Sequence, residues 1–92
     1  MSFRKLRGVH LPERKQGLIR YTCLNFGEQP RWIQQKIRRL CEDCGGAYAS
    51  ALFELMTTSA SVTAVSLRHH ISESELYRMR KAFYESWGSG KK

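Results

Sequence analysis

The clearest pattern of apolar and polar positions lies near the C-terminal end of the chain. Over residues 73–87 the apolar side chains recur every three or four positions, at Leu76, Met79, Phe83 and Trp87. At 100° per residue these positions fall within one arc, which is typical of a helix that buries one face. The opposite arc is mostly polar and consists of Ser74, Tyr77, Arg78, Lys81 and Glu85. The pattern therefore predicts an amphipathic helix with an exposed face rich in hydrogen-bonding groups.

A second, shorter helix is predicted just before this one, with Ser61 as its cap. Val65 and Leu76 are spaced to meet across the corner between the two helices, and Ile71 fills the angle. Ser72 begins an S-x-x-E capping box, in which the serine and the glutamate each satisfy a backbone amide of the first helical turn. We therefore expect a helix-turn-helix over residues 61–87, with its turn at residues 70–72.

Three further helical stripes precede this unit. Pro12 can open the first, because its missing amide has no helical partner at that position. The three apolar sides are Leu18, Ile19, Thr22, Cys23 and Phe26; then Trp32, Ile33, Ile37, Leu40 and Cys41; then Tyr48, Ala51, Leu52, Leu55 and Met56. Breaks are expected at Gly27 and over residues 43–46, and Glu54 is expected to be exposed.

The expected fold class is therefore all-α: a compact bundle of about five helices that ends in a helix-turn-helix. Residues 18–26 would also suit a strand, but the chain offers no convincing second strand to pair with it. One helical domain should span residues 12–87, with a basic arm over residues 1–11 and a flexible tail over residues 88–92.

The net charge of +8 narrows the choice of partner. Residues 1–39 contribute +8, residues 40–71 contribute −2 and residues 72–92 contribute +2. Basic residues at both ends favour a polyanionic partner, with nucleic acid first and an anionic membrane surface second. A merely soluble basic protein is the alternative. The sequence contains no apolar run of the roughly 18 residues that a membrane span needs, and no secretory signal, so a cytoplasmic protein is expected.

The three cysteines raise the question of a metal site. Cys41 and Cys44 form one C-x-x-C pair, and Cys23 with His10 would complete four zinc ligands. The pair lies at a predicted helix end and Cys23 fits the buried stripe, so free thiols, no metal and no cofactor are the interpretation we adopt. The sequence also lacks a phosphate-binding glycine loop and any pair of acidic residues suited to acid–base work, so we expect no enzyme.

Residues 65–78, VSLRHHISESELYR, resemble the V-A-x-x-x-G-V-S-x-x-x-V-S-R pattern of bacterial helix-turn-helix proteins. With the helix predicted at residues 47–56, this unit is similar to the three-helix heads of small phage and mobile-element transcription regulators. It is also similar to the sigma-factor region that reads the −35 element. Ser66 stands where Ala is usual and is small enough to fit. His70 stands where Gly is usual and is expected to adopt a positive φ. The resemblance covers about 40 residues and implies duplex DNA binding by residues 72–81.

The candidate DNA-binding residues follow from the docking of one helix in the major groove. Ser74, Tyr77 and Arg78 are placed for base edges, and Lys81, one turn further, is better placed for the backbone. Thr63, Arg68 and His69 are placed for phosphates where the first helix crosses the strand. Ser72, at the start of the reading helix, completes the predicted interface.

The function expected from the sequence is a non-enzymatic transcription regulator that binds duplex DNA sequence-specifically. One alternative is a protein-interaction module that docks on RNA polymerase, and another is the DNA-binding subunit of a recombination or packaging machine. A homodimer is also open. Two surfaces are candidates for it: the helix that carries Trp32, Ile33 and Ile37, and the end around Tyr84 and Trp87.

Overall fold

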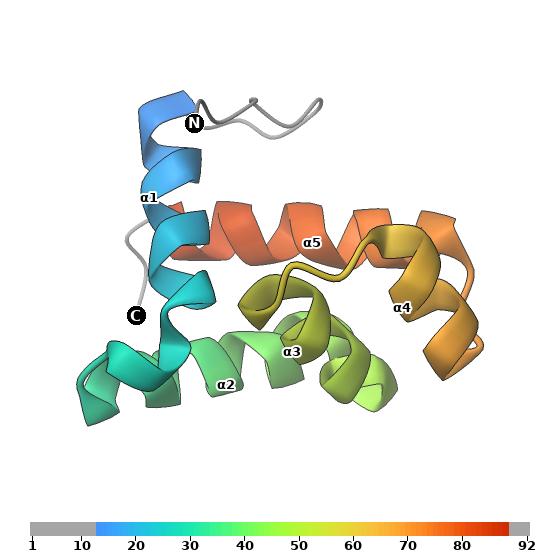
Figure 1. The fold of residues 1–92 in the computed structure, drawn as a ribbon, viewed down its shortest axis with the longest axis horizontal. Helices are drawn as coiled ribbons and strands as arrows, with labels where there is room; N and C mark the ends of the chain where they lie inside the picture. Colours follow the sequence, from blue (N-terminus) through green and yellow to red (C-terminus); the bar gives the residue numbers. More distant parts are fainter. Residues whose placement is uncertain (1–12, 89–92) are drawn as a thin grey trace.

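The computed structural model describes residues 13–88, and this range contains helices and no strand (Figure 1). Its α-helices are α1 (Glu13–Leu24), α2 (Arg31–Gly45), α3 (Ala49–Thr57), α4 (Val62–His69) and α5 (Glu73–Gly88). Two single-turn 3-10 helices, η1 (Phe26–Glu28) and η2 (Gly46–Tyr48), link the first three of them. The predicted all-α class is confirmed, and the strand alternative for residues 18–26 is wrong.

The helices form a compact arrangement in which α3 lies at the centre. It packs against α1, α2, α4 and α5, and α2 also packs against α5. Figure 1 shows α2 and α5 running across the view, with α1 crossing near one end of α5 and α4 at the other end. The radius of gyration is 12.3 Å. Each amphipathic helix thus buries its apolar side against the same centre.

One continuous cluster of buried side chains joins all of these helices. It comprises Ile19, Cys23, Ile37, Cys41, Ala51, Leu52, Leu55, Met56, Val65, Ile71, Leu76, Met79, Phe83 and Tyr84. The predicted arc of Leu76, Met79 and Phe83 is fully buried, and Trp87 packs against its edge. Helical spacing therefore predicts most of the buried faces of α5 and α3, but Tyr48 of the third expected stripe lies in η2 and is 45% exposed.

The first two expected stripes also each include a residue that the structure exposes. In α1 the buried positions are Gln16, Ile19 and Cys23, whereas Leu18 is 64% exposed. At the start of α2, Trp32 is 66% exposed. Both helices carry apolar residues on more than one side, so the neighbouring helices decide which side is buried.

The same packing buries one residue of each of the two predicted dimer surfaces inside the fold. Ile37 is fully buried in the core and Tyr84 is only 1% exposed. Neither side chain is available to a second subunit, so both were misplaced by the sequence pattern. Tyr84 follows Phe83 and lies beside the predicted arc of α5, where α1 and α3 also pack against this helix.

The break after α2 comes later than predicted. The helix continues through residues 43–45 and ends at Gly46, whose φ is +55°. Its ψ is −122°, and this combination of φ and ψ lies outside the left-handed helical region and is readily adopted only by glycine. The preceding Gly45 is buried, and a Cβ added there would meet Leu52 Cβ at 3.4 Å.

One arginine of α1 caps the C-terminal end of α3. Arg20 Nη1 donates hydrogen bonds to the carbonyls of Leu55 and Met56, at 2.9 and 3.0 Å, and Nη2 donates to that of Thr58 at 3.0 Å. A helix ends with carbonyls that have no helical partner and with a partial negative charge. The Arg20 guanidinium donates to these carbonyls and its positive charge offsets their partial negative charge. It therefore holds α1 against α3.

The predicted basic arm (residues 1–11) and Pro12 lie outside the described residues, as do residues 89–92 of the predicted tail. Gly88, placed in that tail by the sequence pattern, is the last residue of α5. Among the helices that the structure describes, none combines the length and the apolar character that a membrane crossing requires.

Candidate nucleic-acid interface

The corner between α4 and α5 is built on one residue in a left-handed conformation. His70 has φ 57° and ψ 47°, as expected for the position where Gly is usual. Its amide and that of Ile71 both donate to the Ser66 carbonyl, which ends α4. The Ser66 hydroxyl donates to the Ile71 carbonyl. This bond gives the serine a role that alanine would not have: it fastens the turn to the last part of α4.

Below the corner, the side chains of Val65, Ile71 and Leu76 are buried. Ile71 therefore fills the angle between α4 and α5, as its place between two helix caps predicts. Because three apolar side chains are removed from water at one bend, the angle between the helices is fixed by packing as well as by the turn.

Both helices of the corner begin at a serine cap. Ser61 Oγ accepts a hydrogen bond from the Ala64 amide at 3.0 Å, and Ser72 Oγ accepts one from the Glu75 amide at 3.2 Å. The second half of the predicted capping box does not form, because the Glu75 carboxylate pairs with Arg78. Of the two side chains of the predicted capping box, only Ser72 therefore caps the N-terminus of α5.

The predicted reading face of α5 is exposed. Ser74 and Lys81 are exposed, Tyr77 is 50% exposed, and the Arg78 side chain is 68% exposed. Ser72 is also exposed, next to the turn. The structure thus brings the α5 candidates together on one surface, near the N-terminal half of the helix.

The predicted phosphate-contacting residues of α4 have partners within the fold. Arg68 forms an ion pair with Glu54, and His69 Nε2 lies 2.7 Å from the same carboxylate. Thr63 Oγ1 donates to Glu73 Oε2 at 2.9 Å. The expectation that Glu54 is exposed is wrong: its side chain is only 21% exposed, because α4 packs over this part of α3.

These carboxylates make the interface nearly neutral by itself. The cations Arg68, Arg78 and Lys81 are matched in number by the acidic side chains Glu54, Glu73 and Glu75. An exposed ion pair such as Arg78–Glu75 contributes only about 0–1 kcal/mol. Arg78 can therefore leave its carboxylate partner at small cost, and the surface as a whole carries almost no net charge.

Sequence reasoning missed the acidic partners and one further cation. Arg80 stacks over the Tyr77 ring, 5.2 Å from its centroid, on the side of α5 between the reading face and the core. Its position on the helical wheel predicts this flank, but not the contact with the Tyr77 ring. Glu54 is separated from Arg68 and His69 by 14 and 15 positions, so only the packing of α3 on α4 reveals the cluster.

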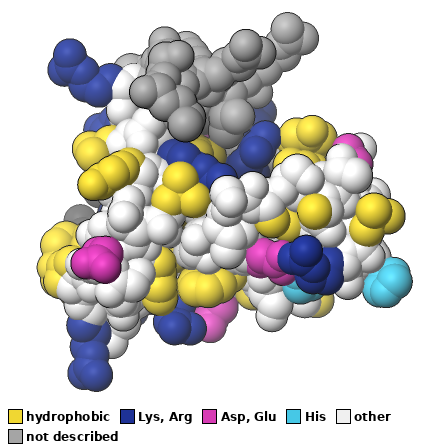
Figure 2. All heavy atoms as spheres, in the orientation of Figure 1, with side chains coloured by type: hydrophobic (Ala, Val, Ile, Leu, Met, Phe, Trp, Pro, Cys, Tyr) yellow, Lys and Arg dark blue, Asp and Glu magenta, His cyan; other side chains and the backbone are white. Residues whose placement is uncertain are grey.

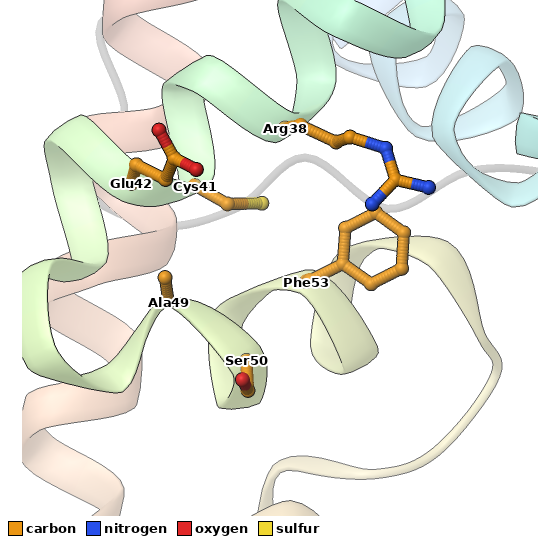
Figure 3. Close-up of a pocket in the computed structure, with 6 residues that line it drawn as sticks. All are labelled: Arg38, Cys41, Glu42, Ala49, Ser50 and Phe53. Atoms are coloured by element: carbon orange, nitrogen blue, oxygen red, sulfur yellow. The ribbon is translucent and has the colours of Figure 1, made fainter.

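A shallow pocket of about 260 Å³ lies between α2 and α3, away from any predicted site residue (Figure 3). It is lined by Arg38, Cys41, Glu42, Ala49, Ser50 and Phe53. The Arg38 guanidinium lies over the rings of Phe26 and Phe53, at 5.1 and 5.4 Å from their centroids. Burial raises the pKa of the Cys41 thiol to about 12, so at neutral pH it is a protonated core side chain and a poor nucleophile.

The other cysteines share this character. Cys23, Cys41 and Cys44 are free thiols, and burial raises the pKa of Cys23 to about 12. The part of the chain that the structure describes contains no group of three or more side chains able to hold a metal ion. His10, the fourth ligand of the zinc alternative, lies outside that part.

Comparison with known proteins adds no assignment: no family model matches the chain, and no curated protein or solved structure is significantly similar to it.

Proposed function

We propose that the protein is a sequence-specific, duplex DNA-binding transcription regulator of the phage or mobile-element type, in which α4 and α5 act as a helix-turn-helix. The corner between α4 and α5 is the observation that supports it. A left-handed His70, a buried Ile71 and serine caps on both helices hold α5 at a fixed angle, with polar side chains exposed at its start. A rigid helix with an exposed N-terminal half is what major-groove reading requires.

Each side chain of the interface has a distinct role in this proposal. Arg78 exchanges Glu75 for the O6 and N7 atoms of a guanine, and Tyr77 contacts a thymine methyl or a phosphate. Ser72 and Ser74 donate to base edges or phosphate oxygens near the start of α5. Lys81, one turn further, contacts the backbone, as do Thr63, Arg68 and His69 on the α4 side.

The first experiment is selection of bound sequences from a random duplex pool, followed by titration of the selected duplex at several salt concentrations. We expect an enriched motif and an affinity that falls steeply with salt, because cations displace counterions from the phosphates. A palindromic motif would also reveal a dimer. No enrichment, or affinity that does not change with salt, would contradict the proposal.

Two substitutions separate base reading from backbone contact. Arg78→Ala is expected to cost about 1–3 kcal/mol on the selected site and to relax the preference at one base pair. Lys81→Ala should weaken binding to all duplexes alike. Arg31→Ala, an exposed residue at the start of α2, is the matched control. Equal effects of Arg78→Ala on selected and unrelated duplexes would argue against base reading.

One observation favours a protein-interaction module as the second candidate. Leu67, on the outer side of α4, is 72% exposed, and it lies on the same helix as Thr63 and Arg68. A leucine so exposed beside polar groups is suited to contact an apolar patch on another protein, such as RNA polymerase. Leu67→Ser would abolish capture of purified polymerase under this candidate, and would leave DNA affinity unchanged under the first.

A further inference from the structure

The N-terminal part of α2 and the last turn of α5 meet where a lysine lies over a tryptophan ring. Lys36 Nζ is 4.4 Å from the centroid of the Trp87 ring. A contact between an ammonium group and an indole face is attractive, and it therefore orients the lysine side chain. Trp32 lies one helical turn before Lys36 on α2, so this contact also joins the two surfaces that the sequence pattern predicted for a dimer.

The exposed side of α2 next to this contact carries a tryptophan that is open to solvent. Trp32 is 66% exposed, whereas tryptophan is highly buried on average in folded proteins. Gln35 and Arg39 follow it at i+3 and i+7 and are exposed, and Lys36, at i+4, is half-buried. These four residues, which we name the α2 ridge, present one flat apolar ring beside two cations.

The two cations of the α2 ridge take part in none of the ion pairs among the described residues. Those ion pairs belong to Glu54 and Glu75, which hold residues of α4 and α5. The acidic residues of α2 itself, Glu42 and Asp43, are exposed and lie towards its C-terminal end. Figure 2 shows Lys and Arg side chains projecting from the lower edge of the molecule, where α2 runs in Figure 1. The α2 ridge therefore favours an anionic ligand.

A second copy of the chain and a membrane surface are both poorly suited to this ridge. In a symmetric dimer the same cations would face one another across the interface, and like charges placed there repel. A helix that lies in a membrane surface inserts a broad apolar face. The broad apolar face of α2, which includes Ile37 and Cys41, is buried in the core. A ligand with both flat rings and phosphates uses the exposed indole and the cations together.

We propose that the α2 ridge binds a single-stranded nucleic acid. The Trp32 ring stacks on one base, Lys36 and Arg39 contact the phosphates beside it, and Trp87 positions the Lys36 ammonium. Every base has a flat face, so this stacking requires no particular sequence. In a duplex the neighbouring base pairs cover those faces, and the ridge therefore prefers an open strand of DNA or RNA.

This binding goes beyond the proposed reading of a duplex and does not depend on it. The reading face occupies the N-terminal half of α5, whereas Trp87 lies in the last turn of that helix. The two surfaces are therefore separate, and the experiments on the α2 ridge use ligands of their own.

The first test measures the binding of a labelled oligothymidylate of about 12 nucleotides by fluorescence anisotropy at several salt concentrations. Trp32→Ala should weaken binding about fivefold or more at every salt concentration, because stacking releases no counterions. Arg39→Ala should instead flatten the log–log salt dependence by about 0.7, the slope for one phosphate contact of a single strand. No binding by the wild type at low salt, or equal affinities of the wild type and Trp32→Ala, would overturn the proposal.

Two variants serve as matched controls. Tyr48→Ala removes a ring that is 45% exposed at the other end of α2. Arg14→Ala removes an exposed cation at the start of α1, which Figure 1 shows on the opposite side of the molecule from α2. Both should leave affinity for the strand nearly unchanged, and Trp32→Phe should keep most of the affinity that Trp32→Ala loses. If the controls lose as much affinity as Trp32→Ala and Arg39→Ala, the strand does not bind at the α2 ridge.

Tryptophan fluorescence reports the stacking directly. The oligothymidylate should quench the emission of the wild type in a saturable way, because a base comes to lie on the Trp32 ring. In Trp32→Phe the remaining emission comes from Trp87, which is half-buried, and should change less. Equal quenching of Trp32→Phe and the wild type would show that no base stacks on Trp32, and the proposal fails.

Further titrations separate the possible ligands. Oligouridylate and oligothymidylate strands of equal length show whether RNA or DNA is preferred, and tight binding of either strand supports the site. If Trp32→Ala weakens a duplex as much as the single strand, the preference for an open strand is wrong. If Trp32→Ala instead abolishes binding to phosphatidylserine vesicles, or a dimer seen by sedimentation equilibrium, with strand affinity unchanged, the ridge binds a membrane or a second copy and the proposal is overturned.

Discussion

At the scale of single residues, the cysteines show how burial changes chemistry. Cys23 and Cys41 look like half of a zinc site in the sequence, yet both are 2% exposed or less and lie among apolar side chains. Removal from water disfavours the thiolate and raises both pKa values to about 12. These thiols therefore act as small apolar core residues at neutral pH.

This burial predicts a loss of stability at alkaline pH. The Cys23 thiol ionises near pH 9.0 in the unfolded chain and near 12 in the folded protein, so its contribution is complete below pH 9 and is lost as the pH rises towards 12. In the wild type, each such thiol should lower the free energy of unfolding by up to about 1.4 kcal/mol per pH unit in this range.

Urea unfolding at a series of pH values between 9 and 11 measures the slope. Cys23→Ala is expected to show a smaller slope than the wild type, whatever its absolute stability. Cys44→Ala, which removes a less buried thiol, should change the slope less. Parallel curves for the wild type and Cys23→Ala would show that Cys23 ionises as readily in the folded protein as in the unfolded chain.

At the scale of elements, the joint between α4 and α5 depends on short-range bonds. The Ser66 carbonyl and hydroxyl hold the turn from one side, and the Ser72 hydroxyl caps α5 on the other. Between them, His70 keeps a φ of 57°, which costs an L-residue about 1–2 kcal/mol relative to a right-handed conformation. The corner therefore carries some strain that glycine would not.

His70→Gly is expected to stabilise the fold by about 0.5–1 kcal/mol, because relief of the strained φ exceeds the extra freedom of glycine in the unfolded chain. His70→Val should destabilise it, since a β-branched residue tolerates this φ poorly. His70 is exposed, so neither change disturbs the core. Urea unfolding of the two variants gives the comparison, and a lower stability of His70→Gly would show that the imidazole contributes more than the strain costs.

At the scale of the whole molecule, attraction of the proposed polyanionic partner depends more on where the charges lie than on the net charge. The net charge of +8 does not fall on the candidate interface of α4 and α5, where the carboxylates of Glu54, Glu73 and Glu75 balance the cations Arg68, Arg78 and Lys81. Glu54 has the largest effect, since it holds both Arg68 and His69 on the edge that is proposed to meet a phosphate backbone. The excess of positive charge lies in residues 1–39 instead.

Glu54→Gln is therefore expected to raise affinity for duplex DNA about threefold to tenfold at low salt, with a steeper salt dependence, because Arg68 becomes free to meet a phosphate. The fold should lose up to about 1 kcal/mol, because the contacts of the Glu54 carboxylate with the half-buried His69 and the exposed Arg68 are weakened. Fluorescence anisotropy with a labelled duplex measures the first effect. Glu85→Gln, at the far end of α5, is the control; an unchanged or lower affinity of Glu54→Gln would show that Arg68 does not approach the backbone.

The sequence by itself determined the features that depend on neighbours within a few positions. Helical spacing identified the buried arc of Leu76, Met79 and Phe83, and cap chemistry identified Ser61 and Ser72 as helix starts. The place of His70 between a helix end and a cap predicted its positive φ. These are local effects, because a cap, a turn or one face of a helix is defined by residues one to four positions apart.

Only the tertiary structure decided which side of an ambiguous helix is buried and which charges meet. Leu18 and Trp32 are apolar yet exposed, Tyr84 is buried, and Glu54 contacts Arg68 and His69 of another helix. The pairing of Arg20 with the end of α3 likewise joins residues 35 or more positions apart. Such contacts depend on how helices pack on one another, and the spacing of residues within a helix carries no information about its neighbour.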